Sequence, residues 1–188
     1  HLAGGTHHSH FDFGSGFCVF NDLAFTALTL TKTKEVKNIL IFDCDVHQGD
    51  GTARILENND KIFTCSIHSS KNFPYRKANS DLDIGLEDNM SWFGYKRHLL
   101  EGLNKCIERF SPDLVLYVAG VDIHANDRLG RLSIDDEGLF EREMIVLNFF
   151  KNRDIPIATV MGGGYSDDKY ELANRHSTVV KAAHQIWA

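Results

Sequence analysis

The sequence predicts an α/β fold in which helices cover both faces of a parallel sheet, giving three layers in the order α, β, α. Short apolar runs rich in Val, Ile and Phe recur along the chain, and longer segments with apolar residues three and four positions apart lie between them. Continuous apolar strands that alternate with helices are typical of parallel sheets buried on both faces. No linker, repeat or shift in composition divides the chain, so we expect a single domain over 1–188.

The predicted elements alternate in order. Strands are expected at 38–43, 62–67, 114–119 and 157–161, and helices at 21–31, 91–110, 135–151 and 168–187. Asn21 suits a helix N-cap, and Asp135 and Asp168 place acidic side chains at the starts of the last two helices. The polar segment 68–89 is expected to be irregular, and a loop of that length is usually functional or mobile.

The bulk composition narrows the function classes. The 188 residues carry a net charge of −6, which disfavours the basic surface that nucleic-acid binding needs, so we expect no direct nucleic-acid binding. No run approaches the ~20 apolar residues of a membrane helix, so no membrane contact is expected. The four cysteines form no CxxC pair, which favours reduced core thiols in a cytoplasmic protein.

The stretch 41–51, IFDCDVHQGDG, begins as a buried strand and ends as a cluster of acids. With period-two alternation, Asp43, Asp45 and His47 project from one side of the strand end. The apolar run at 114–119 leads into Asp122, and the carboxyl ends of neighbouring parallel strands meet at one edge of a sheet. An Asp/His/Asp set with an open position is the layout of a catalytic zinc, with Fe(II), Co(II) or Mn(II) as possible substitutes.

A simpler interpretation is that Asp43 and Asp50 cap turns around Gly49 and Gly51. That interpretation would hold for one aspartate alone, and the convergence of several acids disfavours it.

Adjacent histidines lie in the Gly-rich N-terminal stretch GGTHHSHFDFGSGFCVFND. His7 and His8 show no apolar periodicity that would bury them, so they are either surface residues or a functional pair. Paired imidazoles beside surplus aspartates suggest general acid–base chemistry, in which each carboxylate fixes the tautomer of one ring. His10 is interpreted as incidental.

Five motifs resemble the zinc-dependent histone deacetylase superfamily, which includes acetylpolyamine amidohydrolases and acetoin-utilisation proteins. They are GGTHH, GFCVFND, DCDVHQGDG, AGVDIHANDRLGRLS and GGGY, and they run in order from His1 to Tyr165. The DRLGRLS version and Gln48 are most similar to the class IV branch and its bacterial relatives. The resemblance implies an arginase/deacetylase-like fold and an amidohydrolase that removes acetyl or longer acyl groups from lysine side chains, peptides or polyamines.

The resemblance also implies roles for individual residues. The zinc ligands would be Asp45, His47 and Asp122. The catalytic residues would be His7 and His8, oriented by Asp43 and Asp50, together with Tyr165, which would donate a hydrogen bond to the scissile carbonyl. The substrate tunnel would be lined by Phe17, Phe73, Gly16 and Gly163. A potassium ion would lie near Asp43, Asp45, His47, Ser66 and Ile67, bound largely through carbonyls.

Deacetylases carry a substantial segment before the histidine pair, whereas this sequence opens at His1 inside a motif. We therefore expect a catalytic domain that lacks its N-terminal part, with apolar surface exposed and homo-oligomerisation as one way to cover it. Two alternatives remain open. One is a non-catalytic acyl-lysine-binding or scaffolding fragment. The other is an arginase-like hydrolase with two manganese ions, which the position of Asp50 disfavours.

Overall fold

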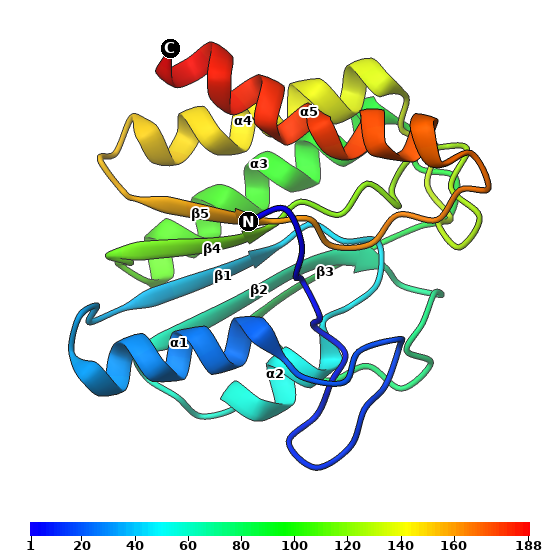
Figure 1. The fold of residues 1–188 in the computed structure, drawn as a ribbon. Helices are drawn as coiled ribbons and strands as arrows, with labels where there is room; N and C mark the ends of the chain where they lie inside the picture. The colour runs from blue at the N-terminus through cyan, green and yellow to red at the C-terminus, as the bar shows by residue number, and fades with distance from the viewer.

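Five parallel strands form the centre of the computed structural model, which describes residues 1–188 (Figure 1). The strands are β1 (Ile39–Asp43), β2 (Ile62–Ser69), β3 (Leu82–Leu86), β4 (Leu114–Val118) and β5 (Ile157–Val160), in the order β3-β2-β1-β4-β5. The chain builds outward from β1 to β3 and then returns to the other side of β1 for β4 and β5. The order therefore reverses between β1 and β4, which is where ligand sites of open parallel sheets collect.

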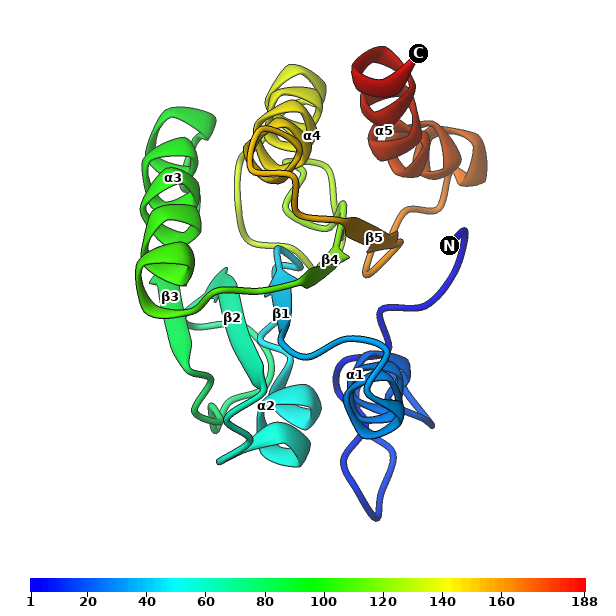
Figure 2. The ribbon, with the colours of Figure 1, turned by 90° about the vertical axis from the view of Figure 1, so that its left-hand side faces the viewer.

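Helices cover both faces of the sheet, as predicted. The first face carries α1 (Asp22–Thr33) and α2 (Asp50–Leu56), and the second carries α3 (Trp92–Arg109), α4 (Asp136–Lys151) and α5 (Lys169–Trp187) (Figure 2). The predicted N-caps are confirmed by hydrogen bonds. The side chain of Asn21 accepts from the N–H of Ala24, that of Asp135 from Gly138, and that of Asp168 from Tyr170 and Glu171.

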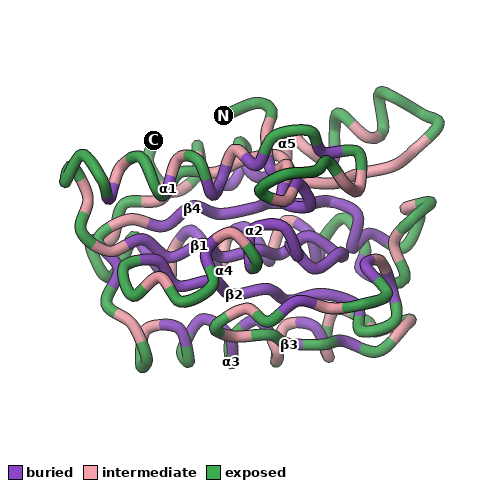
Figure 3. The backbone as a smooth tube through the Cα atoms, turned by 90° about the horizontal axis from the view of Figure 1, so that it is seen from below, coloured by how far each residue is buried: buried purple, intermediate pink, exposed green.

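The sheet lies between two apolar clusters. Figure 3 shows the strands β1, β2 and β4 mostly in the colour of buried residues. Leu40 and Phe42 of β1 belong to the cluster beneath α3–α5, while Ile39 and Ile41 of the same strand belong to the cluster beneath α1 and α2. Successive side chains of a strand point to opposite faces, so a strand covered on both sides must be apolar at every position. This explains the continuous apolar run before Asp43.

Two elements differ from the prediction. The segment 68–89 was expected to be irregular, but 82–86 within it forms β3, so the prediction is wrong there. β3 is an edge strand with only Ile84 and Leu86 buried, and its polar residues and Gly85 hide the strand pattern. The seven-residue helix α2 was not predicted either, because it is too short to show a helical period.

The four cysteines are free and buried, as expected of core thiols. None of the helices combines the length and the apolar character that a membrane crossing requires.

Candidate active site

The carboxyl ends of β1 and β4 bring three possible metal ligands together. Asp45 and His47 follow β1, and Asp122 lies in the loop after β4. Their ligand atoms all lie within 4.8 Å of one another, and all three residues are buried. Because β1 and β4 are direct neighbours, residues separated by about seventy-five positions in the sequence meet at one edge of the sheet.

The arrangement of donor atoms fits a small cation. Nδ1 of His47 lies 3.1 Å from Asp45 Oδ1 and 3.1 Å from Asp122 Oδ2. The other carboxylate oxygens are held by the main chain, because Gly163 N–H donates to Asp45 Oδ2 at 2.6 Å and Val46 N–H donates to Asp122 Oδ1 at 2.9 Å. One oxygen of each carboxylate and one imidazole nitrogen therefore face a common point, and two buried carboxylates favour positive charge there.

The pKa values of His47 and Asp122 also reflect the negative charge of the two buried carboxylates. Burial alone would lower the pKa of His47, but the neighbouring carboxylates of Asp122 and Asp45 raise it to about 10. Burial and the charge of Asp45 raise the pKa of Asp122 to about 7. A divalent cation would relieve the repulsion between the two carboxylates.

Gly163 is placed against these carboxylates rather than along the pocket. A Cβ atom at this position would lie 2.2 Å from Asp122 Oδ2, so a larger residue could not approach closely enough to donate to Asp45. Gly163 is absent from the residues that line the neighbouring pocket, where the resemblance had placed it. Its position is that of a support for the metal-ligand group.

Two histidine–aspartate pairs lie beside the metal-ligand group. His7 Nδ1 is 2.7 Å from Asp43 Oδ2, and His8 Nδ1 is 2.6 Å from Asp50 Oδ1. The centroids of the two imidazole rings are 4.1 Å apart. Asp43 is the last residue of β1 and Asp50 the first of α2, so β1 and the helix that follows it supply both carboxylates.

The two imidazoles differ in environment. Burial alone would lower the pKa of His7, but the charges of Asp43 and Asp45 outweigh it and raise the pKa to about 9. The pKa of His8 is lowered from its ordinary value by burial and by the charge of His7. Only His8 of the pair lines the adjoining pocket, so the neutral ring is the one exposed to a ligand.

This pocket has a volume of about 570 Å³ and opens above His8 and His47. The predicted tunnel residues Gly16, Phe17 and Phe73 line it, and Phe73 contacts the His8 ring edge-on at 4.8 Å between centroids. Tyr165 also lines it, with its ring 6.2 Å from that of His47. Burial and the charges of Asp45 and Asp122 raise the pKa of Tyr165, so its hydroxyl stays protonated and can donate a hydrogen bond.

The expected potassium residues lie along the neighbouring strand. Ser66 and Ile67 belong to β2, where Ser66 Oγ lies 2.9 Å from His68 Nδ1 and the side chain of Ile67 is fully buried in the core. Asp43 pairs with Ser66 in the register of β1 and β2. Potassium at this position remains a prediction.

Sequence reasoning missed three residues that support the site. His10, interpreted as incidental, lies 3.1 Å from Asp50 Oδ2. Asp127 accepts the N–H of Tyr165 at 2.6 Å, and Arg142 is fully buried beneath the loops that carry Asp45 and Asp122. One signal was available for Arg142, because it falls among Leu139, Val146 and Phe150 on the apolar face of its helix, where a charge needs a partner.

The fold and the site define a parallel α/β domain with an Asp/His/Asp group that could hold a metal ion and two histidine–aspartate pairs at the strand ends. The chain belongs to the histone deacetylase domain family, whose sequence model matches residues 1–181.

Among related sequences, an uncharacterized protein of Picosynechococcus is 44% identical over 98% of this chain and 62% of its own length. Histone deacetylase 2 of Arabidopsis thaliana is 30% identical over 87% of this chain and 43% of its own length. The acetoin utilization protein AcuC of Staphylococcus aureus is 35% identical over 75% of this chain and 39% of its own length. The chain thus spans between about two fifths and three fifths of the lengths of these relatives.

Two solved structures share the fold. An acetylpolyamine aminohydrolase from Burkholderia pseudomallei matches with a TM-score of 0.77 at 20% identity, over 96% of this chain and 53% of that one. An HDAC homologue from Aquifex aeolicus matches with a TM-score of 0.77 at 23% identity, over 98% of this chain and 49% of that one. The expected deacetylase-like fold is therefore confirmed.

Proposed function

We propose that this domain is a zinc-dependent amidohydrolase that removes acetyl or longer acyl groups from lysine side chains or related amines. One observation carries the proposal. The metal-ligand group of Asp45, His47 and Asp122 adjoins a pocket into which His8 and Tyr165 also face. A cation site, a general base and a hydrogen-bond donor around one cavity are the parts that amide hydrolysis requires.

Zinc suits the donor set of two carboxylates and one imidazole, and a zinc ion bound there would polarise the amide carbonyl and lower the pKa of water. Fe(II), Co(II) and Mn(II) suit the two oxygen ligands as well.

His8 acts as the general base. Its Nδ1 is bound to Asp50, so Nε2 is free to accept the proton of the attacking water and later return it to the leaving amine. His7 lies behind it, held by Asp43, and contributes positive charge. The hydroxyl of Tyr165 donates a hydrogen bond to the oxygen on which negative charge develops.

The two alternatives make different predictions for this site. An arginase-like enzyme needs carboxylates for a second metal, but Asp50 is engaged by His8 and His10, and the structure brings together one group of possible ligands. A non-catalytic acyl-lysine-binding fragment would need none of the hydrogen bonds that orient His8. The complete set of polar groups around the pocket favours catalysis.

The test is hydrolysis by metal-loaded protein of three substrates in parallel: an acetyl-lysine peptide, a long-chain acyl-lysine peptide and an acetylpolyamine. We expect release of the free amine from at least one of them. His8→Gln should reduce turnover by about 10²–10⁴, the usual contribution of a general base.

The matched control is His98→Gln, which changes a histidine on α3 outside the pocket and should leave turnover unchanged. Acyl-lysine binding without turnover would favour the non-catalytic alternative, and two metal ions per chain would favour the arginase-like one.

A further inference from the structure

The carboxylate of Asp50 lies between two imidazoles. Oδ1 lies 2.6 Å from His8 Nδ1, and Oδ2 lies 3.1 Å from His10 Nε2. No other hydrogen-bond donor of the chain reaches this carboxylate. These two rings therefore supply all the hydrogen bonds that orient the Asp50 carboxylate.

The second histidine–aspartate pair is held differently. Asp43 binds His7 through Oδ2, while its Oδ1 accepts the backbone N–H of Asp45 at 3.0 Å. The main chain thus fixes the carboxylate behind His7. Behind His8, the imidazole of His10 stands in the place of that backbone donor.

The His10 ring packs against a residue of its own loop, Phe13. The imidazole stacks on Phe13, with centroids 4.3 Å apart and ring planes inclined by 14°, and the N–H of His10 donates to the carbonyl of Phe13 at 3.0 Å. The side chain of His10 is 17% exposed, so most of it is removed from water. Stacking and burial restrict the rotamers of the His10 ring, so less side-chain entropy is lost in the contact with Asp50, which favours a well-oriented hydrogen bond.

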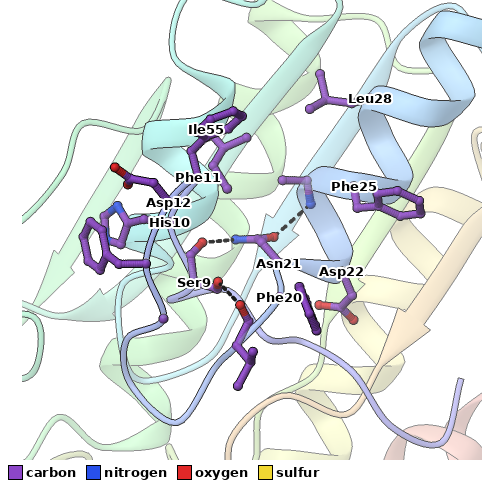
Figure 4. Close-up of a pocket in the computed structure, with 14 residues that line it drawn as sticks. Ser9, His10, Phe11, Asp12, Phe20, Asn21, Asp22, Phe25, Leu28 and Ile55 are labelled. Atoms are coloured by element: carbon purple, nitrogen blue, oxygen red, sulfur yellow. Dashed lines mark hydrogen bonds between the residues drawn. The ribbon is translucent and has the colours of Figure 1, made fainter.

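His10 also lines a second cavity, a groove of about 760 Å³ beside α1 (Figure 4). Figure 4 shows His10 and Asp12 at one end of this groove, with Phe25 and Leu28 of α1 towards the other. His10 lines the groove and Asp50 does not. The Asp50 carboxylate, whose side chain is 9% exposed, is thus largely shielded from solvent, while the imidazole that contacts it forms part of the groove wall.

Asp50 remains an acceptor for both rings. Burial alone would raise its pKa, but the hydrogen bonds and charges of His8 and His10 outweigh burial and hold the pKa below its ordinary value. An ionised carboxylate can accept one N–H at each oxygen at the same time.

We propose that His10 is a positioning residue of the amidohydrolase site. Its Nε2–H fixes the Asp50 carboxylate with Oδ1 towards His8, which holds His8 in the tautomer that carries its proton on Nδ1 and leaves Nε2 free in the pocket. This inference rests on the proposed function, in which His8 Nε2 is the base.

Two substitutions of His10 test separately its hydrogen-bond donor and its aromatic ring. His10→Phe keeps an aromatic ring to stack on Phe13 but removes the donor, whereas His10→Gln loses the ring but places an amide N–H at a similar reach. We expect His10→Phe to lower kcat about tenfold or more, the loss typical when a supporting hydrogen bond is removed from a functional side chain. KM and metal content should be unchanged, and His10→Gln should recover most of kcat. Parent-like kcat in His10→Phe, or equal losses in the two variants, would overturn the proposal.

A second measurement does not depend on turnover. The His8 Nδ1–H proton, bound to an ionised carboxylate, should give a low-field NMR signal in the parent and in His10→Gln, and the signal should broaden or disappear in His10→Phe. Identical signals in all three proteins would contradict the positioning role. If the parent hydrolyses no acyl substrate, the proposed function fails, and the NMR comparison still decides the role of His10. Should His10→Phe not fold, His10→Leu removes the same donor with a smaller side chain and takes its place.

Discussion

The guanidinium of Arg142 donates a hydrogen bond of 2.6 Å from Nη1 to the carbonyl oxygen of Gly120, two residues before Asp122. The same nitrogen lies 3.3 Å from the carbonyl oxygen of Cys44, one residue before Asp45. Arg142 thus connects, through hydrogen bonds to main-chain carbonyls, the two chain segments that carry the proposed metal-ligand carboxylates. Its charge is balanced by Glu143, which also accepts the hydroxyl of Tyr117 at 2.7 Å.

Arg142→Met should strongly destabilise the protein. The substitution removes the only cation paired with the buried Glu143 carboxylate, which keeps just the neutral hydroxyl of Tyr117, and it removes the donor from two buried carbonyls. We expect a loss of about 3–5 kcal/mol in the free energy of unfolding. Urea unfolding of the parent and the variant measures it. Arg54→Met is the matched control, because Arg54 pairs with Glu57 on the surface and should cost at most about 1 kcal/mol. Equal losses of unfolding free energy in the two variants would mean that the buried pair stabilises the protein no more than the surface pair does.

Asp122→Ala should abolish metal binding while the fold persists. The substitution removes one of the three proposed ligands, and it also leaves the N–H of Val46 without its acceptor, which should cost about 1–3 kcal/mol of stability. Metal analysis after dialysis should find one ion per parent chain and none in the variant, with circular dichroism unchanged. Asp60→Ala, on an exposed turn, should keep the ion. A full complement of metal in Asp122→Ala would contradict the ligand assignment.

Tyr165→Phe should reduce kcat by about 10²–10³, the usual loss when one donor to a developing oxyanion is removed. KM should change little, because the hydroxyl interacts mainly with charge that appears in the transition state. Steady-state kinetics with metal analysis alongside measures both quantities. Tyr170→Phe makes the same chemical change at a residue that is 90% exposed, and it should behave as the parent. Full turnover in Tyr165→Phe would rule out the proposed mechanism.

His176 should make the stability of the protein depend on pH. Its Nδ1 is buried without a hydrogen-bond partner, and burial together with the charge of Arg142 lowers its pKa below the ordinary histidine value of about 6.5. The unfolded chain therefore binds more protons than the folded chain below about pH 6.5, so this residue makes stability fall as the pH falls.

His176→Gln should flatten the decline in the free energy of unfolding below about pH 6.5 and leave its pH dependence above about pH 7.5 unchanged. Denaturant unfolding across this range measures the effect. His184→Gln is the control on the same helix, since His184 is exposed. The assignment is wrong if the curves for His176→Gln and the parent run parallel through the acidic range.

Much of the fold could be predicted from the sequence, because the strands covered on both faces must be apolar at every position. Leu40 and Phe42 belong to one layer, and Ile39 and Ile41 to the other, and that requirement is visible in the chain. The position of β3 could not be predicted, because an edge strand buries few side chains and its polar residues resemble a loop.

The sequence by itself determined the types of residue at the site and their attachment to strand ends, because metal and proton chemistry needs carboxylates and imidazoles. Only the tertiary structure decided which groups support them. His10 reaches Asp50 across forty positions, and Arg142 reaches Cys44 across ninety-eight. Such contacts depend on how loops and helices pack against the sheet, and no local pattern encodes a hydrogen bond between residues so far apart in the chain.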